Sequence, residues 1–482
     1  MTSMNRRGTH TSLTVAVTVG LLAVDLFATC GGGGGGGTGG MGSGMGNQNV
    51  YPVPWKNAKL GDPIDPAGLA LYWFPASQNE LEKSSLRNSR LLALSAAQCV
   101  SLGVADVRSP LGLKFAADVQ PPVAVLADGG GTIIGKAVGN ADGKLKVDQV
   151  EKLLGTELKA RETAVKGALK DAKDKAKTDK DAAIALYKSV VDRRCMFASQ
   201  AKDAVKELKK LGVTDLPQIA EGPVMDPVKG DAIEKALRDG VMAEGMEKYT
   251  EAEKFYAQAR RLDPADPAPL RYLGELYRHQ TGDWVKARAA FQQILDMRAD
   301  PMSRAVALHG IGKMAIHDGE FLKGLHLMEQ SADLFPLPLT YRNLAVYWHS
   351  EGDRAKADAY TQKALALDPD EPFNVVFAAA FAAGEGGARA HEALQVAQAH
   401  EDLLCASYNL AAIHAQLGDR NKALALLKRH FYEYERFDAV RSKEMMEARV
   451  DAVFASIVAD PEFMALTGQA DGKLPMPSRT RQ

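Results

Sequence analysis

The sequence predicts a multidomain chain in which a small α/β domain precedes a long all-α array of helix pairs. Residues 52–158 alternate strand-like apolar runs with segments that favour helix. From residue 216 to residue 466, a helical pattern recurs about every 34 residues. The chain has 482 residues, and a single domain usually takes about 100–200, so several domains are expected.

The composition is that of a globular protein, with 46% hydrophobic and 25% charged residues. The 59 basic and 60 acidic residues give a net charge of -1, which argues against a protein that coats nucleic acid. We therefore expect no nucleic-acid partner. The chain contains 44 glycines, and their excess lies between residues 31 and 46.

The first thirty residues have the features of an export signal. Arg6 and Arg7 precede an apolar run over residues 13–24, and Cys30 follows shortly after it. This segment resembles a bacterial lipoprotein signal, although Thr29 departs from the usual residue before the cysteine. The resemblance implies that Cys30 is lipidated, that the protein is anchored to a membrane of the bacterial cell envelope, and that residues 1–30 are its signal. Secretion through an ordinary signal and a cytosolic protein with an accidental apolar start remain alternatives.

Residues 31–51 are glycine-rich and should form a flexible tether, because such a segment has few side chains that could build a core. The domain that follows spans residues 52–158. It should contain strands, helices and a hairpin around an Asp-Gly turn. The expected elements are a strand at 69–74, a helix at 77–89, apolar runs at 91–97 and 99–107 with strand character at 104–107, hairpin strands at 123–127 and 132–138, and a helix at 147–158.

This order of elements, with a proline just before the first hairpin strand, resembles the thioredoxin fold. In that family the proline is preceded by a cis peptide bond and faces the active site, which implies this role for Pro122, or for Pro121 one position earlier. The family's two redox cysteines would fall within residues 75–80, where this chain has no cysteine. Disulfide exchange needs a thiolate nucleophile. The resemblance therefore implies a redox-inactive domain that serves as a docking surface.

The four cysteines are far apart, at Cys30, Cys99, Cys195 and Cys405, and form no CxxC motif. We expect the protein to be stabilised by packing and not by a disulfide framework. Cys99 lies in an apolar segment and should be a small buried residue. The alternative is that it is a lone reactive thiol.

Residues 159–215 are lysine-rich and favour helix. The last helix of this segment should end at Gly212, which suits a helix C-cap. We interpret this segment as a charged helical connector with solvated faces. A patch for anionic lipid or polymer is the alternative.

In the clearest copies of the repeat, a small residue in a first helix is followed by a Gly-Asp turn, a second helix with alanines, and a terminating proline. Examples are Gly274 with Gly282-Asp283, and Ala345 with Gly352-Asp353. This motif resembles the tetratricopeptide repeat (TPR), whose helix pairs stack into a superhelix. A weak copy covers residues 373–400, residues 452–466 should form one amphipathic capping helix, and residues 467–482 a disordered tail.

The TPR resemblance implies that the first helix of each pair lines a concave face. The polar and basic side chains that map onto that face would suit an acidic or C-terminal peptide segment of a protein partner. Ordinary solvated side chains are the alternative for these positions. The candidate peptide-binding residues are Arg271, Arg278, His279, His309, Lys313, His317, Arg342 and Asn343.

Catalytic motifs are missing from the sequence: there is no GxSxG and no HExxH, and no cysteine or histidine spacing typical of zinc. We expect no catalytic residues, no metal and no cofactor. The sequence favours a non-enzymatic, envelope-tethered scaffold for protein interaction. Two alternatives remain: a thioredoxin-like redox or chaperone factor acting through a lone cysteine, and a self-assembling structural component of the envelope.

Overall fold

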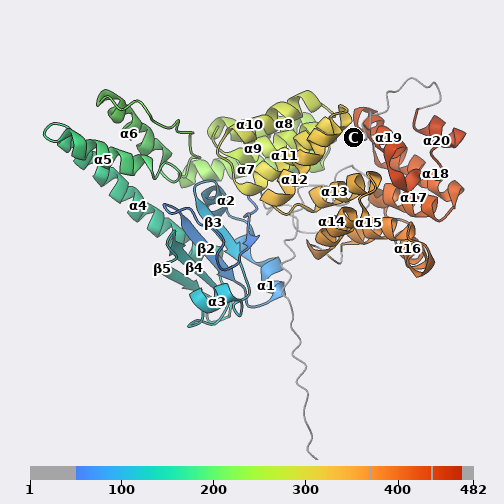
Figure 1. Ribbon diagram of the computed structural model, residues 1–482, viewed down its shortest axis with the longest axis horizontal. Helices are drawn as coiled ribbons and strands as arrows, with labels where there is room; N and C mark the ends of the chain where they lie inside the picture. The colour runs from blue at the N-terminus through green and yellow to red at the C-terminus, as the bar shows by residue number, and fades with distance from the viewer. Residues whose placement is uncertain (1–49, 368, 370, 436–437, 469–482) are drawn as a thin grey trace, which may run out of the picture.

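The computed structural model describes residues 50–367, 369, 371–435 and 438–468. The predicted signal with Cys30, most of the tether and most of the tail lie outside these residues. A small mixed sheet with three short helices comes first, and helices α4 to α20 follow it (Figure 1). The predicted order, a small domain with a sheet followed by a long helical array, is therefore confirmed.

The sheet has five strands in the order β1-β3-β2-β4-β5. Strand β3 runs parallel to both β1 and β2, whereas β4 is antiparallel to both β2 and β5. The strands expected at 69–74, 123–127 and 132–138 are present, but strand character falls at 100–104 rather than at 104–107. The bounds are β1 Lys56–Asn57, β2 Leu69–Phe74, β3 Val100–Val104, β4 Val123–Asp128 and β5 Ile133–Val138.

Strand β2 is buried on both faces, which explains its continuous apolar sequence. Leu69, Leu71 and Trp73 pack into one core cluster and the alternate residues into another, as a side-chain period of two requires. The short helices begin at serines whose side chains accept backbone N–H bonds, which stabilises their first turns. They are α1 Gln78–Lys83, α2 Arg90–Ala96 and α3 Pro110–Phe115, with η1 Ser85–Arg87 between the first two.

The connector is a hairpin of three helices that extends away from the sheet (Figure 1). Helix α4 is one continuous helix, Val147–Lys175, so the boundary expected after residue 158 falls inside it. Helices α5, Lys180–Val191, and α6, Ala198–Lys210, pack against α4 in the same core as the sheet. Gly212 follows α6 with a φ of 84°, the left-handed conformation of a C-cap glycine.

Cys99, just before β3, forms a disulfide with Cys195, in the turn between α5 and α6. The expectation of a disulfide-free, packing-only protein is therefore wrong, as are both interpretations of Cys99, the buried small residue and the lone reactive thiol. The two cysteines are 96 residues apart in the sequence, and their contact depends on how α5 and α6 fold back along α4. No local motif could have indicated this pairing.

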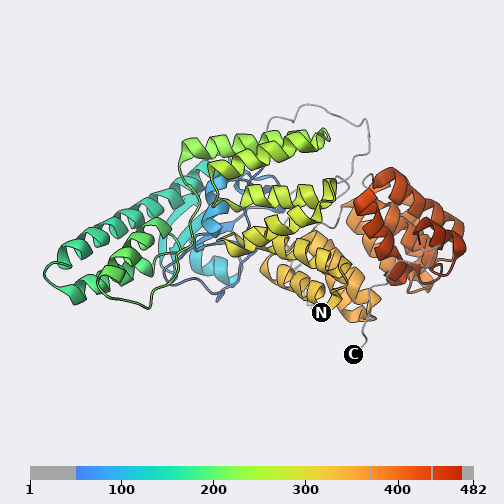
Figure 2. The same cartoon turned by 90° about the horizontal axis from the view of Figure 1, so that it is seen from above.

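The array is built of successive helix pairs that follow one another along the molecule (Figure 2). Six pairs span residues 227–434, and the weak copy at 373–400 is a regular pair. The pairs are α7 Pro227–Gly245 with α8 Tyr249–Leu262, α9 Pro267–Glu275 and η2 Leu276–Gln280 with α10 Trp284–Asp296, α11 Pro301–His317 with α12 Phe321–Leu334, α13 Pro338–Ser350 with α14 Arg354–Leu367, α15 Pro372–Ala383 with α16 Gly387–Ala399, and η3 Leu404–Ala406 and α17 Ser407–Gln416 with α18 Arg420–Arg429 and η4 His430–Tyr434.

The Gly-Asp turns work as the sequence predicts. Gly352 has a φ of 83°, a conformation that favours glycine, and the Asp353 side chain then accepts a bond from the Lys356 backbone N–H at 3.1 Å. Gly274 also acts as predicted, because a Cβ there would collide with the Phe291 ring, and Gly310 of the next pair meets the same ring from the other side. These contacts explain how the helices of neighbouring pairs approach so closely.

The end of the chain differs from the prediction of one capping helix over 452–466. Residues 452–466 contain only η5, Ala452–Phe454, and α20, Pro461–Leu466. Pro461 starts a new helix whose first turn is capped by Asp460, so the segment cannot be continuous. A further helix that the sequence reasoning missed, α19, Asp438–Val450, lies before them.

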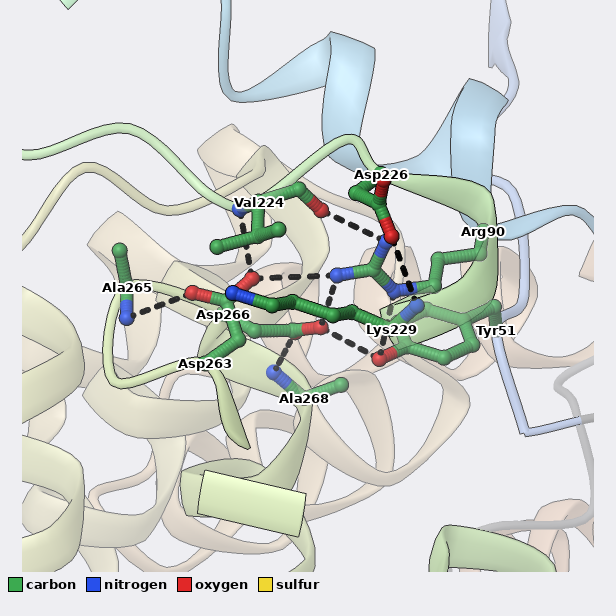
Figure 3. A network of polar contacts seen from close by, with 9 residues as sticks. All are labelled: Tyr51, Arg90, Val224, Asp226, Lys229, Asp263, Ala265, Asp266 and Ala268. Carbon is green, nitrogen blue, oxygen red and sulfur yellow. Dashed lines mark hydrogen bonds and ion pairs between the residues drawn. The ribbon is translucent and has the colours of Figure 1, made fainter. Parts of the chain in front are cut away.

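Arg90 of α2 joins the first domain to the array (Figure 3). Its guanidinium lies 3.1 Å from Asp263 and 3.3 Å from Asp266, and it donates to the Val224 carbonyl at 2.8 Å. The Tyr51 hydroxyl also donates to Asp266. Burial raises the pKa of Asp266 to about 6 against the opposing effect of Arg90. We call this set of residues the Arg90 junction.

Candidate functional site

A cavity of about 250 Å³ lies between the helix pairs and α19, and we call it the central cavity. Its lining comes from η2, α10 to α13, α15, η3, α17, η4 and α19, so residues far apart in the sequence form it together. Stacking of the pairs brings these helices to one side, which follows from the repeat. The first helices of several pairs, which carry the predicted binding residues, therefore line this cavity.

Six of the eight candidate residues line the central cavity, and two do not. The six are Arg278, His279, Lys313, His317, Arg342 and Asn343. Arg271 and His309 are each only 2% exposed and are packed between helices. Arg271 donates to the Ser303 hydroxyl at 3.3 Å, and His309 Nδ1 lies 3.1 Å from the Thr340 hydroxyl. The repeat pattern predicted the helices that line the cavity, but it did not predict which of their side chains are buried between helices.

Glu447 of α19 enters the middle of the candidate residues. It forms an ion pair with Lys313, accepts a bond from the Tyr347 hydroxyl at 2.6 Å, and lies 3.3 Å from His317 Nε2. Burial alone would raise the pKa of Glu447, but Lys313 and His317 outweigh it and hold that pKa well below its usual range. The predicted cationic face is thus occupied by a carboxylate of the same chain.

Two more acidic residues follow the same face of this segment. Glu444 Oε2 lies 2.7 Å from His430 Nε2, and the Tyr408 hydroxyl donates to Asp451 at 3.1 Å. Residues at positions i, i+3 and i+7 share one face of a helix. We call Glu444, Glu447 and Asp451 the carboxylate stripe.

The basic residues at the other side of the cavity are held in place by neighbours. Arg278 lies 2.8 Å from Glu275, which also lies 3.0 Å from His279 Nε2. Burial opposes ionisation of Glu275, yet Arg278 and then His279 lower its pKa to about 2. Arg342 donates to Asn374 at 2.6 Å, and burial lowers the pKa of its guanidinium to about 10. Its charge lies 4.8 Å from the centre of the Phe373 ring.

Sequence reasoning missed the acceptor and hydroxyl side of the site: the carboxylate stripe, Tyr347, Tyr408 and His430. Glu444 and Glu447 do share helical spacing in the sequence, which was a usable signal. Their partners lie on η4, α11, α13 and α17, and only the folded array brings these together.

In the first domain, the peptide bond between Pro121 and Pro122 is cis. Val123, next along the chain, pairs with Phe74 at the end of β2, so Pro122 lies beside the start of residues 75–80. In that segment Ser77 caps α1, and Glu80 accepts the Ala76 backbone N–H at 2.7 Å. Burial raises the pKa of Glu80.

Two further properties concern only the part of the chain that the structure describes. No group of three or more histidine, cysteine, aspartate or glutamate side chains there could hold a metal ion. None of the helices within the described ranges combines the length and the apolar character needed to cross a membrane.

No family model matches the chain. It is 31% identical over 104 residues to the Photosystem I assembly protein Ycf3 of Rippkaea orientalis, a match that covers 21% of this chain and 60% of that protein. It is 29% identical over 127 residues to the CTR9 homolog of Arabidopsis thaliana, covering 26% of this chain and 12% of that protein. Together with the helix pairs, these similarities indicate a TPR-like helical repeat protein.

Proposed function

We propose that this chain is a non-enzymatic scaffold for protein interaction, whose helical array holds a peptide or protein partner in the central cavity. The observation that carries the proposal is the carboxylate of Glu447 bound by Lys313, Tyr347 and His317. This contact supports the idea that the array binds acidic protein segments through charge-assisted hydrogen bonds. The matched protein from Rippkaea orientalis is named as an assembly protein, which is in keeping with a scaffold role.

We also propose that the first domain is thioredoxin-like and acts as a second docking surface without redox activity. The strand order β1-β3-β2-β4-β5 and the cis bond before Pro122 support this assignment. Residues 75–80 have no thiol, and Cys99 is already bonded to Cys195, so the domain has no nucleophile for disulfide exchange at the position expected for it.

An envelope location, with Cys30 lipidated and secretion as the second choice, completes the proposal. The disulfide between Cys99 and Cys195 supports export, because such bonds persist in oxidising compartments. Fractionation of cells that express the wild type and Cys30→Ser tests the anchor. Release of the variant from the membrane fraction is expected, whereas retention would count against lipidation.

Cross-linking and pull-down from the native cell envelope test the scaffold role. We expect a specific partner with the wild type, and loss of that partner with Lys313→Glu, which reverses a charge in the central cavity. Lys254→Glu on α8 is the matched control, since Lys254 is exposed and lies outside the cavity lining. Equal capture by all three chains would show that the cavity does not hold the partner.

A further inference from the structure

The charges that line the central cavity are divided along the sequence. Every lining residue between Arg278 and Tyr434 is basic, polar or apolar, and none is acidic. The acidic lining residues begin at Glu435, and the three of the carboxylate stripe belong to α19 or directly follow it. Without α19, Lys313, His317 and His430 would lose the carboxylates that contact them. Arg278 and His279 would keep Glu275 as their counter-charge.

The array contacts the acidic face of α19 at three separate places. Glu444 meets η4, Glu447 meets α11 and α13, and Asp451 meets α17. Recognition by the array therefore depends on the positions of the carboxylates along the helix as well as on their charge. A helix with the same number of acidic residues in another order could not satisfy all three contacts.

Helix α19 forms one wall of the central cavity, and most of its side chains are only half-buried. Among its residues with described side chains, only Val440, Ala448 and Arg449 are buried, and the others are half-buried or exposed. Few apolar side chains of α19 are thus fully buried, and polar contacts contribute much of its docking. These are the carboxylate contacts and the bonds that Arg441 donates to the carbonyls of Phe431 and Glu435. Elements with few buried apolar contacts are those that open most easily.

We propose that the central cavity is a recognition site for an acidic helix, and that the partner presents carboxylates at positions i, i+3 and i+7 in place of α19. This inference rests on the proposed scaffold function and adds the chemical class of the partner. In the absence of the partner, α19 is the resident occupant of the site. The partner must then compete with it.

The test measures binding of a fluorescein-labelled peptide with the sequence of residues 438–452 to the full chain by fluorescence anisotropy. In the wild type, α19 should exclude the peptide. Glu447→Lys in the protein places a cation against Lys313 and should release α19, so the peptide should bind at least ten times more tightly than to the wild type. A peptide with Glu444→Gln, Glu447→Gln and Asp451→Asn should bind at least ten times more weakly than the native peptide, and binding should weaken with salt.

A charge swap is the matched control. Combining Lys313→Glu with Glu447→Lys restores an opposite-charge pair between α11 and α19, and the amides of α19 should regain the protection from hydrogen exchange that Glu447→Lys alone removes. Glu447→Gln, which removes the charge without repulsion, serves if the lysine variant does not fold by circular dichroism. Equal binding of the native and neutral peptides, or no binding to either released variant, would overturn the inference.

The oligomeric state tests whether the occupant of the cavity is α19 of a second copy of the chain. If light scattering shows a wild-type dimer that Glu447→Lys converts to monomer, the occupant is a second copy's α19 and the proposal fails. Peptide binding without any native partner in the pull-down would refute the scaffold function and leave the recognition site standing. Capture of a partner that depends on Lys313, without peptide binding, would support the scaffold function and refute the recognition site for an acidic helix.

Discussion

The Arg90 junction and the docking site of α19 each join a cation and a carboxylate from distant segments, 173 and 134 residues apart, and they differ in what surrounds them. At the Arg90 junction, Arg90 is 8% exposed and Asp266 is 0% exposed, within a cluster that joins Val50 and Leu94 to the first helix pair. At α19, Lys313 is 16% and Glu447 is 20% exposed, and the helix buries few apolar side chains. The first contact is enclosed by a core, whereas the second is a polar contact at the edge of a cavity.

This difference separates a fixed joint from an exchangeable one. A buried ion pair surrounded by apolar packing costs much to break, because each charge left alone has no access to water. A pair with partial access to water, such as Lys313 and Glu447, can exchange its partner for water or for another carboxylate at lower cost. The same chemistry therefore holds the first domain on the array and, at the other site, leaves room for competition.

The largest effect is expected from Arg90→Met, which leaves Asp263 and Asp266 buried without their counter-charge. We expect a loss of about 3–5 kcal/mol in the free energy of unfolding, measured by denaturant titration. Arg108→Ala is the matched control, because Arg108 is 76% exposed and pairs only with nearby Asp106. It should change stability by less than about 1 kcal/mol. A small effect of Arg90→Met would show that the junction is not the fixed joint.

The disulfide is a second restraint on the fixed side of the molecule. Replacing both cysteines, Cys99→Ser with Cys195→Ser, should lower the free energy of unfolding by about 2–4 kcal/mol, because the bond closes a long loop in the unfolded chain. Denaturant titration measures this loss. Ser101→Ala, at an exposed position in β3, is the control and should remain within about 0.5 kcal/mol of the wild type. A double variant as stable as the wild type would mean that packing alone holds the connector hairpin.

How much of this comparison the sequence could predict depends on the range of the interactions involved. The Gly352-Asp353 turn and the small residue at Gly274 act within a helix pair, so the repeat reveals them. Strand β2 was evident because its apolar run is local. The pairing of Cys99 with Cys195 and the docking of α19 join segments that only the folded chain brings together. The burial of Arg271 and His309 was missed for the same reason: a repeat position gives the face of a helix but not what covers it.

Glu447→Gln tests whether the contacts of this carboxylate hold α19 on the array. Loss of the charge-assisted bonds should destabilise docking of α19 by about 1.5–3 kcal/mol, and its amides should exchange hydrogen about ten times faster or more. Mass spectrometry of hydrogen exchange at neutral pH measures this, and the amides of α2 and α7 should be unaffected. Asp438→Asn is the control, since Asp438 is on the same helix and 91% exposed. Protection of α19 that survives Glu447→Gln would mean that apolar packing holds it.

The smallest effect, and the one that distinguishes the two sites by sign, is their response to pH. The pKa of Glu447 is depressed from an ordinary value of 4.5, so its stabilisation is complete above that pH and is lost as pH falls further. The pKa of Asp266 is instead raised from 3.8 to about 6, so the folded state takes up a proton and the Arg90 junction gains stability as pH falls through 6.

Fluorine NMR of the fluorotryptophan-labelled chain can follow Trp284, whose ring lies 3.5 Å from the Lys443 ammonium of α19. Its signal should change below pH 4.5, where Glu447 loses its charge. Between pH 7 and 5, the free energy of unfolding of the wild type should rise relative to that of Asp266→Asn. A change in the Trp284 signal near pH 6 that Asp266→Asn abolishes would show that the two sites are coupled, and the separation between a fixed and an exchangeable joint does not allow this.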